Sequence, residues 1–157
     1  MEKISDETAG SASVLEGIEF RNEIPAEEFL ALRASVEFQK LTEKQAETIL
    51  ANTTYTVCAV KDGEYIGVTR LLYDFGMDGY ITDVIVRPDM QGLGLGSMLV
   101  KNVVDFVKEN SMEGVTATCN LYAMPGKEPF YEQLGFQSLP YSKYGSGMLI
   151  VAKYGKK

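Results

Sequence analysis

The sequence predicts a protein that combines helices and strands, α/β in the broad sense and α+β in the narrower one. Its sheet should be mixed, with helices packed on its faces. Its first apolar, β-branched runs follow one another as neighbours, and Asp62-Gly63 between two of them is a strong hairpin signal. Later strand-like runs alternate with helical patterns. The glycine-rich segment 91–96 joins an apolar strand to the longest helical pattern.

The length and composition suit one domain. The chain has 157 residues, 45% of them hydrophobic, and a chain of this size buries roughly two thirds of its unfolded surface. Residues 1–17 are acidic and contain Ser, Gly and Ala without the apolar core of a signal peptide. We therefore expect a disordered tail over residues 1–17 and a single domain over 18–157.

The first half of this domain is predicted to begin with a short strand. Pro25 suits the first turn of a helix, and Thr42 with Gln45 forms a capping box at the start of another. The Asp62-Gly63 turn then joins two strands. The predicted elements are a strand at 18–21, helices at 25–37 and 42–52, and strands at 55–60 and 65–73.

The second half alternates strands with helices. Pro88 lacks a donor for a sheet ladder, so the strand before it should end at Arg87-Pro88. Apolar residues three or four apart place the start of the next helix near Gly94. The predicted elements are a turn at 76–79, a strand at 80–86, the long helix, a strand at 115–120, a short helix at 128–134 and a last strand at 148–153.

The glycine-rich turn is typical of an anion cradle, and pyrophosphate is the expected guest. A dinucleotide site would need an acidic residue at the end of the next strand, where Asn120 stands. A nucleoside-triphosphate loop needs Gly-Lys-Ser/Thr, but Gly96-Ser97 lacks the lysine and Gly126-Lys127 is followed by Glu128. An ordinary glycine-rich turn without a ligand is the remaining alternative.

Two segments resemble the signatures of the GCN5-related N-acetyltransferases. Residues 84–96 contain Gln-Gly-Leu-Gly-Leu-Gly after an apolar strand, which is similar to that family's acetyl-CoA-binding signature. Residues 129–136, Pro-Phe-Tyr-Glu-Gln-Leu-Gly-Phe, are similar to its second signature. The order and separation of the two segments also fit, and the resemblance covers residues 18–153.

The resemblance implies an acyl-CoA N-acyltransferase fold with a mostly antiparallel, mixed central sheet flanked by helices. It implies acetyl-CoA as cosubstrate, no metal, and direct transfer of the acetyl group to a primary amine of a small molecule or peptide. In the family the pantetheine arm lies where the strand at 84–86 splays from its neighbour. A non-catalytic acyl-CoA-binding regulatory domain is the alternative. The residues implied in coenzyme binding are Val84, Ile85, Val86, Gln91, Gly92, Leu93, Gly94, Leu95 and Gly96.

Acetyl transfer requires an oxyanion donor, an acid and a base. A backbone N–H near Val86 suits the oxyanion. The resemblance assigns Tyr131 the role of acid, and a phenol with a pKa of about 10 stays protonated at neutral pH; its alternative role is aromatic packing. Asp83 interrupts an apolar strand, so it is a candidate base or else a brace for a neighbouring loop. Weaker candidates for the base are Glu64, Asp74 and Glu128, and an amine can also lose its proton to bulk water.

One position departs from the family pattern. Many members carry a coenzyme-contacting Asn seven residues before the signature tyrosine, but Met124 stands there in this chain. Asn120 is the neighbouring residue that could substitute for it, provided that the loop shifts.

Composition narrows the chemistry and the partners. The chain contains no histidine, which excludes Ser-His-Asp and Cys-His arrangements and removes the usual zinc ligands. The formal net charge of −7 argues against a nucleic-acid partner and favours a small cationic amine as acceptor. No apolar stretch is long enough to span a membrane, and we expect no membrane partner. The sequence is compatible with a homodimer and does not determine the oligomeric state.

Cys58 and Cys119 each lie in an apolar run, where a small buried side chain is the expected role. Two unpaired cysteines suit an intracellular, cytoplasmic protein. Four aromatic residues are candidates for the wall of an acceptor site, and core packing or loop anchoring is their alternative role. Its members would be Tyr73, Phe75, Tyr141 and Tyr144.

Overall fold

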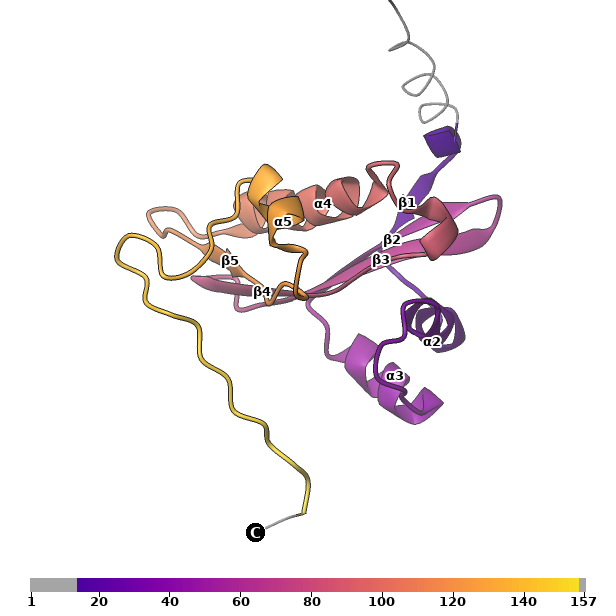
Figure 1. The fold of residues 1–157 in the computed structure, drawn as a ribbon, viewed down its shortest axis with the longest axis horizontal. Coiled ribbons are helices and arrows are strands. Elements are labelled where there is room, and N and C mark those ends of the chain that lie inside the picture. Colours follow the sequence, from indigo (N-terminus) through magenta and orange to yellow (C-terminus); the bar gives the residue numbers. More distant parts are fainter. Residues whose placement is uncertain (1–13, 156–157) are drawn as a thin grey trace, which may run out of the picture. The chain divides into compact units, whose positions relative to one another are not determined.

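The computed structural model describes residues 14–155, which fall into two compact units that divide between Tyr122 and Ala123. Figure 1 shows the chain as a ribbon coloured along the sequence. Most of the predicted disordered tail, residues 1–13, lies outside the described residues. Val14, just inside them, accepts a hydrogen bond at its carbonyl from Nζ of Lys61.

The first unit is built on a five-stranded sheet whose spatial order is the sequence order, β1-β2-β3-β4-β5. Its first four strands are antiparallel, and β5 runs parallel to β4. This confirms the predicted mixed, mostly antiparallel sheet. The strands are β1 (Glu19–Arg21), β2 (Tyr55–Lys61), β3 (Glu64–Tyr73), β4 (Asp78–Val86) and β5 (Thr118–Asn120).

The hairpin signal between β2 and β3 is confirmed. Asp62 and Gly63 form the connection with φ angles of 50° and 82°, and two consecutive left-handed residues match the right-handed twist of the flanking strands. By contrast, the strand predicted at 115–120 is shorter than expected. Val115 donates its N–H to the carbonyl of Met112 in a turn, so pairing starts only at Thr118.

Helices cover both faces of the sheet (Figure 1). α2 (Ala26–Ser35) and α3 (Glu43–Ala51) lie on one face, and α4 (Leu95–Asn110) lies on the other. The predicted capping box is present, because Thr42 Oγ1 accepts from Gln45 N at 3.2 Å and Thr42 N donates to Gln45 Oε1 at 2.8 Å. None of the helices in residues 14–155 combines the length and apolar character needed to cross a membrane.

Two sets of apolar side chains hold these layers together. α2 and the sheet share a buried cluster that includes Phe29, Leu32, Val68 and Ile85. On the other face, α4 buries one stripe of residues spaced three or four apart, as the sequence periodicity predicts. The stripe consists of Leu95, Leu99, Val100, Val103 and Val107.

The second unit contains α5 (Glu128–Gln133), close to the predicted short helix. The strand predicted at 148–153 is wrong: residues 145–153 are described, and none is in a strand or helix. Leu149 and Ile150 are 76% and 90% exposed. An apolar, β-branched run is suited to a pleated surface, but a strand forms only where another strand supplies its hydrogen bonds.

Candidate functional site

The glycine-rich turn follows β4 as the sequence predicts. A short 3-10 helix, η1 (Pro88–Met90), leads into Gln91, and α4 begins at Leu95. Gly92 and Gly94 have φ angles of 77° and 89°, in the left-handed region that favours glycine. A Cβ at either position would meet nothing within 4 Å, so the backbone there faces open space. A ligand can approach this backbone closely.

The start of α4 offers unpaired donors to that space. Gly94 is the N-cap and has no side chain with which to cap the first turn. The first backbone bond of the helix runs from Met98 N to Gly94 O at 3.2 Å. The N–H groups before Met98 therefore keep the unsatisfied, positively polarised character of a helix N-terminus. This geometry fits an anionic guest such as a pyrophosphate.

β4 also presents an open edge beside the turn. Its pairing with β5 ends at Tyr80 and Asn120, and within the described residues no strand pairs with that edge of β4 from Ile81 to Val86. Arg87 N donates to Ile66 O on β3 at 2.9 Å. Because successive N–H groups of a strand point to opposite sides, those of Val84 and Val86 point to the open edge.

Gln91 ties the turn to this strand. Its Nε2 donates to the carbonyl of Val86 at 2.9 Å. That carbonyl lies on the same open edge as the Val86 N–H, since both groups of one residue point to the same side of an antiparallel strand. The predicted coenzyme-binding residues from Val84 to Gly96 are thus brought together in one continuous segment of the first unit.

Asn120 lies where β4 and β5 part, as the last residue of β5 and opposite Tyr80. Its Nδ2 donates to Gly79 O at 3.3 Å and to Thr118 Oγ1 at 3.1 Å. The side chain is therefore beside the open edge, although its amide N–H groups already have acceptors within the strand pair. A coenzyme contact by Asn120 stays a prediction.

Asp83 lies inside β4 in an unusual backbone conformation, with a φ of 49°. Its side chain is 8% exposed, and its carboxylate accepts from Arg33 Nη1 at 2.5 Å on one oxygen and from Arg70 Nε at 2.7 Å on the other. A general base needs an oxygen free to accept a proton from an amine or a water. The arrangement opposes that role and favours the alternative one, a brace.

Tyr131 lies in α5 of the second unit, within an aromatic cluster of its own signature. Its ring centroid is 4.9 Å from that of Phe130 and 5.8 Å from that of Phe136, both nearly edge-on. Burial raises the pKa of the Tyr131 phenol above its ordinary value. A raised pKa keeps the phenol protonated at neutral pH, as an acid requires, while the cluster also accounts for its packing.

The weaker candidates for the base, Asp74, Glu64 and Glu128, each have a structural role. Asp74 accepts from Gly76 N at 2.8 Å and from Asp78 N at 3.1 Å, and these backbone bonds lower the pKa of its carboxyl. Glu64 pairs with Arg87 at 2.8 Å. Glu128 is exposed at the start of α5, where a carboxylate suits the helix N-terminus.

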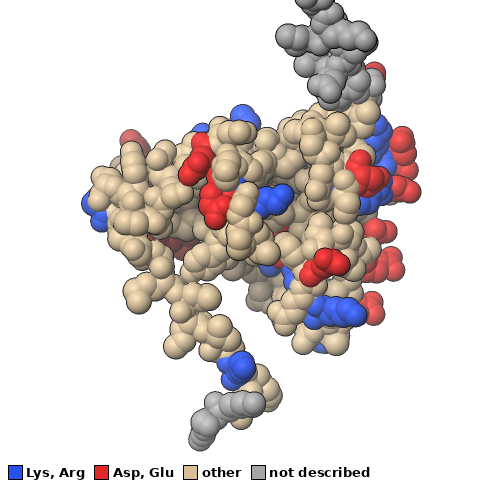
Figure 2. All heavy atoms as spheres, in the orientation of Figure 1, with Lys and Arg blue, Asp and Glu red and all other residues tan. Residues whose placement is uncertain are grey.

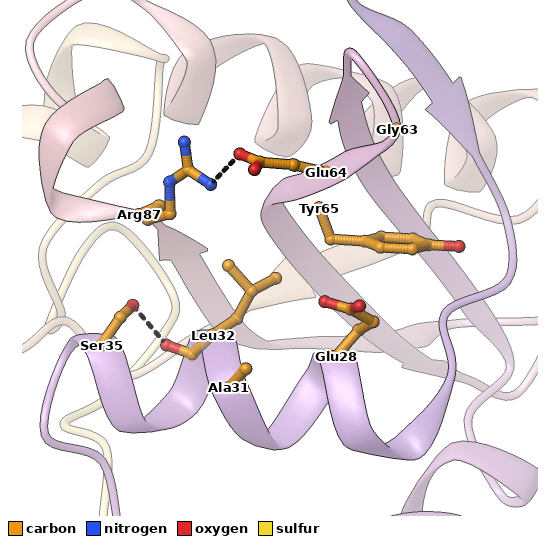
Figure 3. Close-up of a pocket in the computed structure, with 8 residues that line it drawn as sticks. All are labelled: Glu28, Ala31, Leu32, Ser35, Gly63, Glu64, Tyr65 and Arg87. Atoms are coloured by element: carbon orange, nitrogen blue, oxygen red, sulfur yellow. Dashed lines mark hydrogen bonds and ion pairs between the residues drawn. The ribbon is translucent and has the colours of Figure 1, made fainter.

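A shallow pocket of about 300 Å³ lies between α2, the β2–β3 hairpin and the end of β4 (Figure 3). Arg87 pairs there with Glu64 and also with Asp89 at 2.7 Å, and these carboxylates raise its pKa. Two acceptors on one guanidinium fix the start of the glycine-rich turn to the beginning of β3. The pocket is lined by Glu28, Ala31, Leu32, Ser35, Gly63, Glu64, Tyr65 and Arg87.

Acidic side chains gather at this end of the first unit, around the β2–β3 hairpin and α2 (Figure 2). Within the described residues, no group of three or more His, Cys, Asp and Glu side chains is arranged to hold a metal ion.

The sequence interpretation missed the arginines of this site. Arg70 interrupts the apolar run of β3 just as Asp83 interrupts that of β4, and it is 8% exposed. A charged residue in each of two adjacent strands is a signal that could have paired them. Arg33 gives no such signal, because it ends a helix where a basic residue is common.

Comparison with known proteins agrees with this geometry. The model of the acetyltransferase (GNAT) family matches residues 19–136. An uncharacterized N-acetyltransferase, ycf52, of Pyropia yezoensis is 28% identical over 106 residues, which cover 65% of this chain and 59% of that protein. GCN5-related N-acetyltransferase 3, chloroplastic, of Arabidopsis thaliana is 27% identical over 75 residues, covering 48% and 30%. The chain thus spans less than two thirds of these curated relatives.

Solved structures extend the match to the fold. A probable acetyltransferase from meticillin-resistant Staphylococcus aureus superposes with a TM-score of 0.74 at 26% identity, covering 86% of this chain and 99% of that one. Glucosamine-6-phosphate N-acetyltransferase from Arabidopsis thaliana has a TM-score of 0.63 at 16% identity, covering 90% and 100%. The second likeness concerns the fold alone.

Proposed function

This chain belongs to the acetyltransferase (GNAT) family, and from that premise we propose that it is an N-acetyltransferase which moves an acetyl group from acetyl-CoA to a primary amine. The observation that carries the proposal is the open edge of β4, which leads directly into the glycine-rich turn. One segment thereby offers strand-like donors for an extended chain and helix donors for a pyrophosphate.

The residues present fit acetyl-CoA. Gly92 and Gly94 leave open space over the backbone, and the uncapped first turn of α4 supplies N–H donors for phosphate oxygens. The outward N–H groups of Val84 and Val86 suit the amides of a pantetheine arm and the carbonyl of a thioester. Acetyl-CoA supplies the activated acyl group.

The chain's own groups have two roles in the transfer. A backbone N–H of Val84 or Val86 stabilises the negative charge that develops on the carbonyl oxygen as the amine nitrogen attacks the carbonyl carbon. The C–N bond forms, the C–S bond breaks, and the Tyr131 phenol gives its proton to the sulfur. The ammonium loses one proton to water before it attacks, and the second proton, which the nitrogen releases after attack, restores the Tyr131 phenol. The products are therefore an amide and a free thiol, with no acetylated enzyme.

A small cationic amine is the proposed acceptor. The formal net charge of −7 supports this class, because an acidic surface raises the local concentration of an ammonium ion. Neither a nucleic acid nor a membrane surface suits that charge. A cytoplasmic location is proposed as well, and the two free cysteines, Cys58 and Cys119, are in keeping with a reducing compartment.

The proposal is tested first by binding and turnover. Calorimetry should detect acetyl-CoA binding to the wild-type chain, and Gly94→Val should abolish it by filling the space over the turn. Tyr131→Phe keeps the ring but removes the proton, so turnover should fall about 10²–10⁴-fold with little change in acetyl-CoA affinity. Tyr154→Phe is the matched control, since Tyr154 is fully exposed.

Three outcomes count against the proposal. Unchanged binding by folded Gly94→Val removes the turn from the site. Wild-type turnover by Tyr131→Phe, with chemistry shown to limit the rate, returns Tyr131 to a packing role. Binding of acetyl-CoA without turnover over a panel of polyamines, arylalkylamines, amino sugars and lysine peptides favours a non-catalytic acyl-CoA-binding regulator.

A further inference from the structure

The open edge of β4 depends on a bulge at Asp83. The β3–β4 register pairs Val68 with Ile85 but Arg70 with Thr82. Thr69 on β3 therefore faces two residues of β4, Asp83 and Val84, which is the arrangement of a β-bulge. The extra residue is accommodated at Asp83, whose backbone lies in the left-handed region with a φ of 49°.

The bulge decides which backbone groups face outward. Before the bulge, Asp74 N donates to Asp78 O at 3.3 Å. The backbone N–H and C=O groups of even-numbered residues of β4 therefore point to β3 there. Thr118 N donates to Met77 O at 2.8 Å, which places odd-numbered residues on the side of β5. After the bulge the order is reversed, because Arg87 N donates to Ile66 O on β3.

The reversal turns the N–H groups of Val84 and Val86 to the open edge. If β4 continued in the register of residues 78–82 without a bulge, both would point to β3 and be used in its ladder. The proposed reaction thus depends on a backbone conformation that residues with a Cβ rarely adopt. Aspartate tolerates that conformation better than most residues, yet a regular strand still competes with it.

Two ion pairs hold Asp83 in this conformation. Arg33 Nη1 and Arg70 Nε each take one carboxylate oxygen, at 2.5 and 2.7 Å. The arginine side chains are only 12% and 10% exposed. Both guanidinium groups lie over the ring of Phe29, with their central carbons 5.5 and 5.6 Å from its centroid.

The same arginines extend the network to the helices on that face. Arg70 Nη1 donates to Thr53 Oγ1, just after α3, at 2.7 Å. Arg33 Nη2 donates to Gln39 O, in the connection between α2 and α3, at 3.1 Å. The bulge is thereby connected to β3, to α2, to the α2–α3 connection and to the segment after α3, and Asp83 is the group that the two arginines share.

We infer that Asp83 is a positioning residue: its ion pairs with Arg33 and Arg70 hold the bulge that turns the Val84 and Val86 N–H groups to the open edge of β4. This inference rests on the proposed function for its catalytic consequence, because those N–H groups act on the thioester carbonyl. Its structural content concerns the bulge alone and can be measured without turnover.

The test compares Asp83→Asn with Asp62→Asn. Both positions are left-handed aspartates, with φ angles of 49° and 50°, but Asp62 lies in the β2–β3 turn. Asp83→Asn keeps the shape and loses the charge that holds both arginines. Backbone hydrogen exchange by NMR should speed up at Ile85 and Arg87, which bond to β3 beside the bulge, and Asp62→Asn should leave these amides unchanged.

Turnover adds a second readout. Misplacing a catalytic donor by about 1 Å can cost up to about 10²-fold, so kcat should fall by about tenfold to a hundredfold in Asp83→Asn. Acetyl-CoA affinity should fall less than kcat, since the turn that holds the pyrophosphate is intact and only the contacts of Val84 and Val86 are weakened. The pH–rate profile should keep its shape, whereas removal of a general base would abolish its acidic limb.

A double variant checks that the residues act as one unit. Arg70→Gln should cost little further kcat in the Asp83→Asn background, because the shared interaction is already lost. If Asp83→Asn does not fold, Arg33→Gln removes one ion pair and keeps the other, and it should show the same exchange pattern in weaker form.

The possible results separate this inference from the proposed function. Unchanged exchange at Ile85 and Arg87 in folded Asp83→Asn overturns the positioning role, as does loss of the acidic limb with the bulge intact. A wild-type chain that neither binds nor uses acetyl-CoA overturns the proposed function. The exchange measurement then still decides whether Asp83 holds the bulge.

Discussion

Gly67 is the position where one added methyl group should disturb both the stability of the first unit and the glycine-rich turn. It lies on β3 beneath α4, opposite Val86. A Cβ there would stand 3.0 Å from Leu99 Cδ1, 3.1 Å from Ile85 O and 3.6 Å from Leu95 Cδ2. The first two distances are too short for comfortable contact, and Ile85 O belongs to the backbone of β4.

The surroundings cannot easily give way. Leu99 and Leu95 are 0% and 1% exposed, so neither side chain can rotate into solvent. Overpacking of this kind costs about 1–3 kcal/mol, and the lower entropy of the unfolded chain offsets about 0.4–1 kcal/mol in a Gly→Ala change. We expect Gly67→Ala to lose about 1–2 kcal/mol, which lowers Tm by about 2–8 °C in a chain of this size.

Leu95 is the first residue of α4, so displacement of the helix also moves the N–H groups of the turn. Acetyl-CoA affinity should therefore fall together with Tm. Thermal unfolding and calorimetry would measure the two effects. Gly145→Ala is the matched control, because a Cβ there meets nothing within 4 Å. A Gly67→Ala protein with the Tm and affinity of the Gly145→Ala control would refute the reasoning.

Two further predictions concern pH and salt. Burial raises the pKa of the Cys58 thiol to about 11 from 9.0, so Cys58 contributes stability that is complete below about pH 9 and is lost as pH rises to about 11, by roughly 2 kcal/mol. Denaturant unfolding at pH 8 and 11 should show a smaller alkaline loss in Cys58→Ala than in the wild type, and an equal loss contradicts the assignment. For the acceptor, raising ionic strength should weaken the apparent affinity for a cationic amine through screening. An affinity independent of salt, or turnover of anionic acceptors alone, would leave the charge of −7 with no role in recognition.

Local signals predicted the elements that carry local hydrogen bonds. Thr42 and Gln45 are three residues apart and satisfy each other's backbone groups, so the sequence alone identifies the start of α3. Asp62 and Gly63 likewise identify the β2–β3 hairpin, because both adopt the positive φ angles that its turn requires. The glycines at 92 and 94 are needed for backbone angles within a few residues of one another, which is why the turn and the start of α4 were predictable.

Where the partner is distant, the sequence was a poorer guide. The run at 148–153 has the composition of a strand, but composition does not say which strand edge it would join, and in the structure these residues belong to no strand. The bulge in β4 was equally hidden. An extra residue in a strand has no composition signal unless it is glycine, and here it is Asp83.

The role of Asp83 shows where the boundary lies between what a sequence can and cannot say. A carboxylate inside an apolar strand must have a compensating partner, and that much follows from the cost of burying a charge. Arg70, 13 residues away, interrupts the neighbouring strand of the same meander and was within reach of such reasoning. Arg33 is 50 residues away on a helix that packs across the sheet, and only the tertiary structure brings it to the second oxygen. With one arginine the carboxylate would keep one oxygen without a charged partner; with two, each oxygen accepts from a guanidinium, and the side chain is 8% exposed. The preference for a brace over a base therefore rests on the one contact that no local pattern encodes.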